Sequence, residues 1–179
     1  MILTMKLRDE AMLMLDKRGS VLDTARRVST LMQENNIKGA IIGGVAVVLH
    51  GHIRTTKDVD VLIQQALSSF QSVLESAGAD FNRRKREFIL DSIPIHLVDQ
   101  KMIQPLRQRT IVIEEVTTVS LADLINMKLR SGISNIARAQ DIADVIGLIK
   151  SKNLTGAFAA KIEKSLRAEF RKLIKAVNQ

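Results

Sequence analysis

The spacing of apolar residues along the chain predicts helices near its start. Over residues 4–35 they recur at intervals of three and four, and Gly19-Ser20 interrupts them. This segment therefore predicts two helices, with Ser20 as the N-cap of the second. Residues 38–42 form a short apolar run that predicts a buried strand, and residues 45–50 predict a short helix that ends at Gly51.

The middle of the chain has the patterns of a small sheet. Residues 58–63 alternate, which places Val59, Val61 and Ile63 on one face of a strand and the two aspartates with Leu62 on the other. Further elements are expected as a helix over 66–77 with Gly78 as its stop, a hairpin of 86–90 and 93–99, a short helix or loop over 102–107, and a strand over 110–116.

From Ser120 onward the pattern is helical. Ser120 and Asp123 resemble a capping box, and helices are expected over 136–150 and 156–177. The chain therefore predicts an α+β (α/β-like) fold, a small mixed sheet with flanking helices and a helical C-terminal half. Strands give way to helices at 117–120. We expect residues 1–119 to form the N-terminal helices and core, and residues 120–179 a helical region packed on it in one compact unit.

Composition narrows the classes of function. The 179 residues include no cysteine, which excludes disulfides and cysteine-type zinc sites and fits a reducing compartment. The formal charge of +8 favours anionic partners, whereas five Phe and no Trp or Tyr count against recognition of single strands by base stacking. No apolar run is long enough to span a bilayer, and charges interrupt the N-terminal apolar residues, so we expect a cytoplasmic protein with no membrane partner.

Two aspartates and two glycines are the first candidates for chemistry. Asp58 and Asp60 lie on one face of a strand with Cα atoms roughly 7 Å apart, so their carboxylates can converge on Mg²⁺ or Mn²⁺. Gly43 and Gly44 have no Cβ atoms, so a ligand can approach the backbone closely, and the helix that follows offers unpaired N–H groups to phosphates.

Arg54 and Thr56 lie between these two pairs and can hold oxygen ligands. Each feature alone has an ordinary structural explanation, since a glycine pair is usually a turn, Arg54 a solvated charge and His50 a helix-end histidine. The order of strand, turn, helix and strand favours a phosphate-and-metal site.

The segment resembles the DNA polymerase β-like nucleotidyltransferase superfamily, and most closely its small bacterial branch with the toxin-type enzymes of toxin–antitoxin and abortive-infection systems. The residues of the first matching block are Gly43-Gly44, Ala46, His50-Gly51, Arg54-Thr55-Thr56 and Asp58-Val59-Asp60-Val61-Leu62. Those of a second block are Leu121, Asp123-Leu124, Lys128, Arg138, Asp141, Asp144 and Leu148. The resemblance spans residues 37–149.

The resemblance implies metal-dependent transfer of a nucleoside monophosphate from an NTP to an acceptor hydroxyl of a protein, an RNA or a small molecule. It also implies an antitoxin-like partner protein. It places Gly43 and Gly44 at the nucleotide phosphates, Asp58 and Asp60 on Mg²⁺ or Mn²⁺, and Lys128 at the phosphates or the base.

Asp141 and Asp144 have a structural interpretation that we favour. At positions i and i+3 of a helix they are expected to pair with Arg138 or Arg130 and to fix the helix to the sheet.

One position departs from the superfamily, which usually has a third carboxylate on a neighbouring strand. In residues 93–99 the position that aligns best is His96, and Asp99 lies on the opposite strand face unless a bulge redirects it. Asp99 is a further candidate metal ligand, because it is the carboxylate nearest to His96 in this strand. Neutral imidazole suits Zn, Cu, Fe or Ni better than Mg²⁺, and it can also act as a general base.

Three interpretations stay open at His96: a changed mechanism, a catalytically impaired protein that binds a nucleotide or a partner, and a structural histidine. The basic residues 83–86 and the basic C-terminal helix fit phosphates of RNA, an acidic antitoxin or a triphosphate equally well. A basic RNA-binding protein with an incidental D-x-D strand is a third hypothesis for the whole chain.

Overall fold

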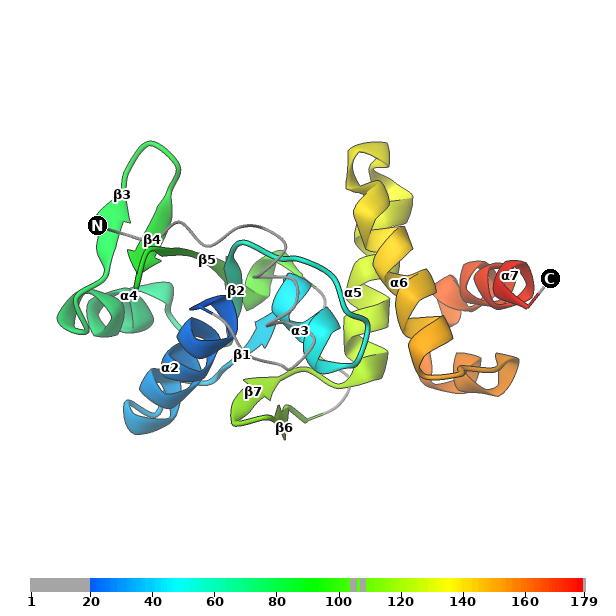
Figure 1. The fold of residues 1–179 in the computed structure, drawn as a ribbon, viewed down its shortest axis with the longest axis horizontal. Coiled ribbons are helices and arrows are strands. Elements are labelled where there is room, and N and C mark those ends of the chain that lie inside the picture. The colour runs from blue at the N-terminus through cyan, green and yellow to red at the C-terminus, as the bar shows by residue number, and fades with distance from the viewer. Residues whose placement is uncertain (1–19, 104–105, 107–108, 179) are drawn as a thin grey trace.

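The computed structural model describes residues 20–103, 106 and 109–178. Seven strands form one mixed sheet in the order β3-β4-β5-β2-β1-β7-β6 (Figure 1). The strands are β1 (Gly39–Ile42), β2 (Val59–Ile63), β3 (Asp80–Asn82), β4 (Glu87–Leu90), β5 (Ile93–Asp99), β6 (Ile111–Ile113) and β7 (Val116–Thr118). The α-helices are α2 (Ser20–Glu34), α3 (Gly43–Leu49), α4 (Leu67–Ser76), α5 (Leu121–Ser134), α6 (Ala139–Ser151) and α7 (Arg167–Val177).

Strand β2 lies at the centre of the sheet. It pairs antiparallel with β1 on one side and parallel with β5 on the other, and β1 pairs parallel with β7. The mixed sheet and the helical C-terminal half confirm the predicted α+β fold.

The two faces of the sheet bury separate cores, as the alternation in β2 predicts. Val59, Val61 and Ile63 belong to a core that α2 and α4 cover, whereas Leu62 belongs to a core formed with α5, α6 and α7. Figure 1 shows these two sets of helices on opposite sides of the sheet. The aspartates of β2 therefore lie on the side of the C-terminal helices.

Several helix ends follow the predicted local chemistry. Helix α2 begins at Ser20, and Gly51 and Gly78 follow helices with φ angles of +95° and +88°. The Ser120 hydroxyl accepts the Asp123 N–H at 3.1 Å and donates to the Asp123 carboxylate at 2.9 Å. The helix predicted before Gly19 lies outside the described residues. Within the part of the chain that the structure describes, no helix is both long and apolar enough to cross a membrane.

The single strand predicted over 110–116 is wrong, because the chain reverses within it. Strands β6 and β7 pair antiparallel around Glu114 and Glu115, whose φ angles are +49° and +67°. Two consecutive residues with positive φ form the tight turn of a hairpin, which usually contains Asn and Gly. Two glutamates give no such signal.

The continuous helix predicted over 156–177 is also wrong. Two 3₁₀ segments, Gly156–Lys161 and Lys164–Leu166, precede α7, and the extended residues Ile162 and Glu163 separate them. Ile162 is fully buried, and the Glu163 N–H donates to Asn126 Oδ1 at 3.0 Å, so contacts with α5 replace helical hydrogen bonds there.

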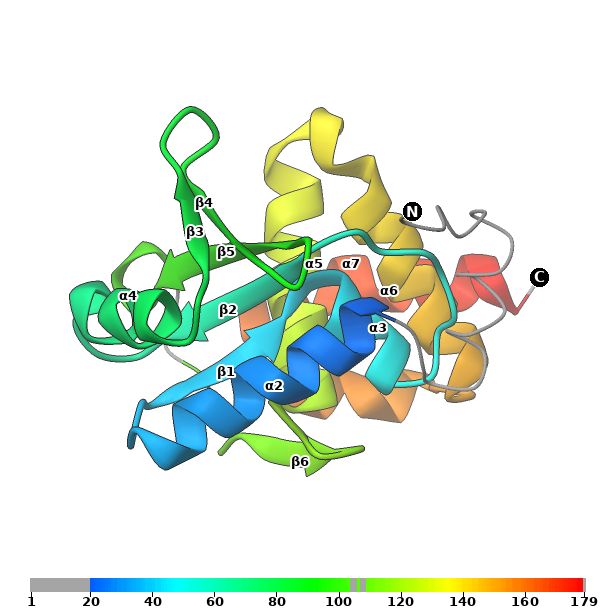
Figure 2. The same ribbon diagram turned by 60° about the vertical axis from the view of Figure 1, so that its left-hand side comes forward.

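Other predicted boundaries differ less. Helix α3 begins at Gly43 itself, and a 3₁₀ turn (Ile136–Arg138) precedes α6. Of the short element expected over 102–107, Met102 belongs to the 3₁₀ turn Gln100–Met102, and residues 104, 105 and 107 lie outside the described residues. Strand β3 was not predicted. With β4 it forms a ribbon that projects from the body and carries the basic residues 83–86 at its tip (Figure 2).

The turn of the β6–β7 hairpin generates a stability prediction. Replacing Glu114 and Glu115 together by Asn and Gly is expected to raise the free energy of unfolding by about 1 kcal/mol, because these residues tolerate positive φ. Urea unfolding measures the change. The helical control Glu75→Gly should lower stability instead, and a destabilised double variant would contradict the turn geometry.

Candidate active site

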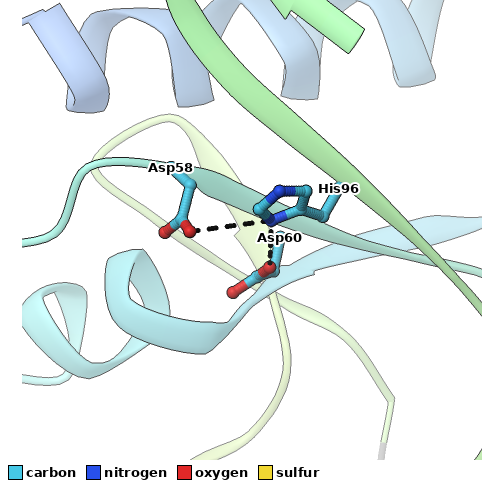
Figure 3. A group of neighbouring side chains, drawn as sticks. All are labelled: Asp58, Asp60 and His96. Carbon is cyan, nitrogen blue, oxygen red and sulfur yellow. Dashed lines mark hydrogen bonds and ion pairs between the residues drawn. The ribbon is translucent and has the colours of Figure 1, made fainter. Parts of the chain in front are cut away.

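Two adjacent strands bring Asp58, Asp60 and His96 together (Figure 3). In the parallel register of β2 with β5, Asp60 lies opposite His96. The His96 Nδ1 atom is 3.3 Å from Asp60 Oδ1 and 3.6 Å from Asp58 Oδ2. One ligand atom from each residue lies within 4.8 Å of the others, a spacing that can hold a metal ion. The position of His96 is the one expected from the sequence for the third carboxylate.

Sequence reasoning missed Glu87 of β4. This residue contacts the His96 ring at Nε2, the nitrogen that faces away from the two aspartates. Its carboxylate lies 3.1 Å from His96 Nε2, and its side chain is only 7% exposed. Lys85 Nζ is 3.6 Å from the same carboxylate. The signal that could have found Glu87 is a lone carboxylate in the strand that pairs with the one carrying His96.

Burial and neighbouring charges shift the pKa values of two groups of the site. Burial, and then the neighbouring charge of Asp58, raise the pKa of Asp60 above its ordinary value, although His96 and Lys128 oppose this change. Burial alone would lower the pKa of His96, but hydrogen bonds and charges from Glu87, Asp60 and Asp58 together raise it. The site is thus a concentration of negative charge that favours a cation.

The glycine pair is in direct contact with these groups. Gly43 has a φ angle of +65°, and a Cβ atom at this position would overlap the Asp60 carboxylate. A Cβ atom on Gly44 would overlap the Thr56 hydroxyl and lie 2.9 Å from Arg54 Nη2. Only glycine therefore allows the start of α3 to lie against the acidic strand.

Thr56 and Arg54 act on neighbouring carboxylates. The buried Thr56 hydroxyl donates to Asp58 Oδ1 at 3.2 Å. Arg54 binds Asp144 of α6 through two atoms, with Nε 2.8 Å from Oδ1 and Nη2 3.1 Å from Oδ2. Both residues lie beside the glycine pair, but each already has a protein partner.

Lys128 belongs to the same buried ion network. Its Nζ atom lies 2.6 Å from Asp141 Oδ1 and 2.8 Å from Asp144 Oδ2, and Arg138 Nε lies 2.9 Å from Asp141 Oδ2. The expected pairing of Asp144 with Arg138 or Arg130 is not found, because Asp144 binds Lys128 and Arg54. Arg130 binds Glu163 of the segment before α7 instead.

Asp99 is not brought into the group. It pairs with Ile63 in the register of β5, on the other face of the sheet from Asp60, and its carboxylate accepts the Lys101 N–H at 2.9 Å. No bulge redirects it, so its carboxylate serves as a helix cap.

A cavity of about 580 Å³ opens beside Asp60, between α5 and residues of the inner strands β1, β2 and β5. Gly43, Arg130, Ser131 and Arg138 also line it. The wall also contains apolar side chains such as Met127. A volume of this size is in the usual range for small-molecule sites, and the wall combines cationic, acidic and apolar side chains, which suits a polar organic ligand.

The buried ion network generates a stability prediction. Asp144→Asn should lower the free energy of unfolding by about 3 kcal/mol, because the buried Lys128 and the partly buried Arg54 lose a carboxylate. The control Arg138→Gln removes a partner whose side chain is 59% exposed and should cost less than about 1 kcal/mol. Equal losses in the two variants would contradict a central role for Asp144.

Asp141 generates a prediction about pH. Burial would by itself raise its pKa, but hydrogen bonds from Lys128, Ser131 and Arg138 and the charge of Lys128 lower it. A carboxyl group with a lowered folded-state pKa stabilises the protein above its unfolded-state pKa of about 3.9, and the benefit disappears as pH falls through the folded-state value. The stability difference between wild type and Asp141→Asn should therefore be largest above about pH 5 and shrink towards pH 3. Urea unfolding across this range measures it, and a constant difference would contradict the assignment.

Comparison with solved structures identifies the fold. The structure is similar to an antigenic nucleotidyltransferase-like protein from Paracoccidioides brasiliensis, with a TM-score of 0.53 and 18% identity over 72% of this chain and 74% of that one. It is also similar to the antibiotic-resistance factor ANT(2'')-Ia, with a TM-score of 0.56 and 16% identity over 87% of this chain and 94% of that one. At these identities the likeness shows the fold alone.

A search of curated proteins gave no sequence match. A family model described as "Nucleotidyltransferase of unknown function (DUF6036)" matches residues 20–166, and the chain therefore belongs to this nucleotidyltransferase family.

Proposed function

We propose that the protein is an enzyme that transfers a nucleoside monophosphate from an NTP to an acceptor hydroxyl and releases pyrophosphate, with a divalent metal ion held by Asp58 and Asp60. The observation that carries the proposal is the convergence of the two carboxylates on one point beside the glycine pair. Membership of a nucleotidyltransferase family supports the reaction class.

The residues present fit a divalent ion. The Asp58 and Asp60 oxygens are ligands that Mg²⁺ and Mn²⁺ accept, and burial, together with the neighbouring charge of Asp58, raises the pKa of Asp60, a cost to its charged form that a cation would offset. When bound, the ion would supply charge stabilisation at the phosphoryl group being transferred.

The remaining side chains position these groups. Thr56 donates to Asp58 and fixes one carboxylate oxygen, while Gly43 leaves room for the Asp60 carboxylate against α3. We assign the phosphates to the backbone at Gly43 and Gly44, of which Gly43 lines the cavity beside Asp60.

The nucleotide would occupy the cavity that begins at Asp60. Lys128 lies in its wall, but its bonds to two aspartates make it a fixed positive charge rather than a mobile phosphate ligand. Arg54 is held in the same way by Asp144. Lys128 and Arg54 therefore assist nucleotide binding through their positive charge. Arg54 also fixes the position of the loop before β2.

His96 is the specific reason to keep a second candidate, a catalytically impaired protein of the same fold that binds a nucleotide or a partner. Calorimetry with NTP and Mg²⁺ or Mn²⁺ separates the two candidates, since binding without transfer of label would favour the second.

The acceptor class and the toxin-type affiliation rest on the motif resemblance. The positive charge of the basic residues 83–86 at the ribbon tip would attract an RNA or protein acceptor, and it would equally attract an acidic antitoxin-like partner. Growth arrest on expression that disappears in Asp58→Ala would support the toxin assignment, and unimpaired growth would count against it.

The transfer reaction itself is the test of the proposed function. Asp58→Ala and Asp60→Ala should each reduce transfer of α-³²P-labelled nucleotide by about a hundredfold or more, because metal binding contributes several kcal/mol to transition-state stabilisation. The matched control Asp99→Asn changes an aspartate on the neighbouring strand that caps a turn and should keep the activity. Transfer that survives both alanine substitutions would refute the assignment.

A further inference from the structure

We propose that His96 Nδ1 is the third protein ligand of the metal and that Glu87 is the carboxylate that orients it. The site would then select an ion that accepts nitrogen, such as Mn²⁺, over Mg²⁺. This inference rests on the proposed function and specifies its metal site.

The spacing of the three donor atoms fits a shared ion. Ligand atoms at about 2.0 to 2.2 Å from one metal ion are roughly 2.8 to 3.1 Å apart at octahedral angles and roughly 3.3 to 3.6 Å apart at tetrahedral angles. The Nδ1 atom of His96 is 3.3 Å from Asp60 Oδ1 and 3.6 Å from Asp58 Oδ2. An ion can therefore contact all three residues with little movement of the side chains.

Glu87 determines which nitrogen faces the metal. Its carboxylate lies 3.1 Å from Nε2 and can accept the Nε2–H, and with the ring proton held there Nδ1 would offer its lone pair to an ion between the two aspartates. A carboxylate that holds a metal-binding histidine in this way fixes the tautomer and makes the ring a better ligand. Glu87 is buried and fixed within β4, whereas the side chain of His96 is 37% exposed.

The donor set decides the selectivity. Two carboxylates and one imidazole suit transition ions that accept nitrogen as well as oxygen, such as Mn²⁺, whereas Mg²⁺ is bound by oxygen ligands. Asp58 and Asp60 alone would offer oxygen only. The imidazole of His96, with the buried Glu87 at its far nitrogen, adds a nitrogen donor that selects against Mg²⁺.

The test is metal binding to the full chain without nucleotide. We expect calorimetry to show tighter binding of Mn²⁺ than of Mg²⁺, and electron spin-echo measurements on bound Mn²⁺ to show coupling to a ¹⁴N nucleus. His96→Asp should remove the nitrogen coupling and reduce the ratio of Mn²⁺ to Mg²⁺ affinity by about tenfold or more. The chain has three histidines, so the matched control His52→Gln should leave both results unchanged.

Variants of Glu87 test the orienting role. Glu87→Ala should weaken Mn²⁺ binding by roughly 10- to 100-fold. Glu87→Gln should retain most of the affinity, because its amide oxygen can still accept the Nε2–H. Circular dichroism and thermal unfolding verify that each variant is folded.

Two outcomes would overturn the inference: absence of nitrogen coupling in the wild type, or an unchanged Mn²⁺ to Mg²⁺ ratio in folded His96→Asp. The proposed function fails separately. Nucleotide transfer with Mg²⁺ and no nitrogen coupling would refute only the ligand assignment, whereas nitrogen coupling without transfer under any ion would refute only the enzyme assignment.

Discussion

The parallel register between β2 and β5 is the constraint on which the candidate site depends. It places Asp60 opposite His96, and a slip of one residue would turn one of these side chains to the other face of the sheet. The register is held from both sides, since Val61 and Leu62 of β2 are buried in different cores. Side chains with no part in chemistry thus fix the separation of the reactive ones.

The glycine pair and the ion network extend this constraint to the helices. Gly43 brings the start of α3 against Asp60, and Asp144 connects the loop containing Arg54 with α6 and, through Lys128, with α5. Gly43, Asp60 and Lys128 all line the cavity. Burial and the charge of Asp58 raise the pKa of Asp60, and a cation would offset both effects. Stability in this region therefore comes from the buried pairs around the site rather than from the site.

Much of the fold and half of the site follow from the sequence. The alternation in β2, the glycine stops and the cap at Ser120 depend on neighbours in the sequence, so patterns of a few residues reveal them. The hairpin at Glu114 and Glu115 was missed because two glutamates adopt positive φ there without a turn signature.

The rest of the site depends on contacts between distant residues. Glu87 reaches His96 only because β4 pairs with β5, and Lys128 meets Asp144 only because α5 packs on α6. The motif identifies position 96 as the place of the third ligand, but it does not identify Glu87 as the partner of His96. Likewise, Asp99 is near His96 in sequence, yet the regular strand leaves it at the cap of the next turn.

The most direct test of the account is a crystal structure of the protein with Mn²⁺ and a non-hydrolysable NTP. The anomalous signal should lie within about 2.0 to 2.3 Å of Asp58, Asp60 and His96 Nδ1. The triphosphate should run along Gly43 and Gly44, and the nucleoside should fill the cavity beside α5. A nucleotide bound elsewhere, or manganese that contacts neither aspartate, would contradict the account.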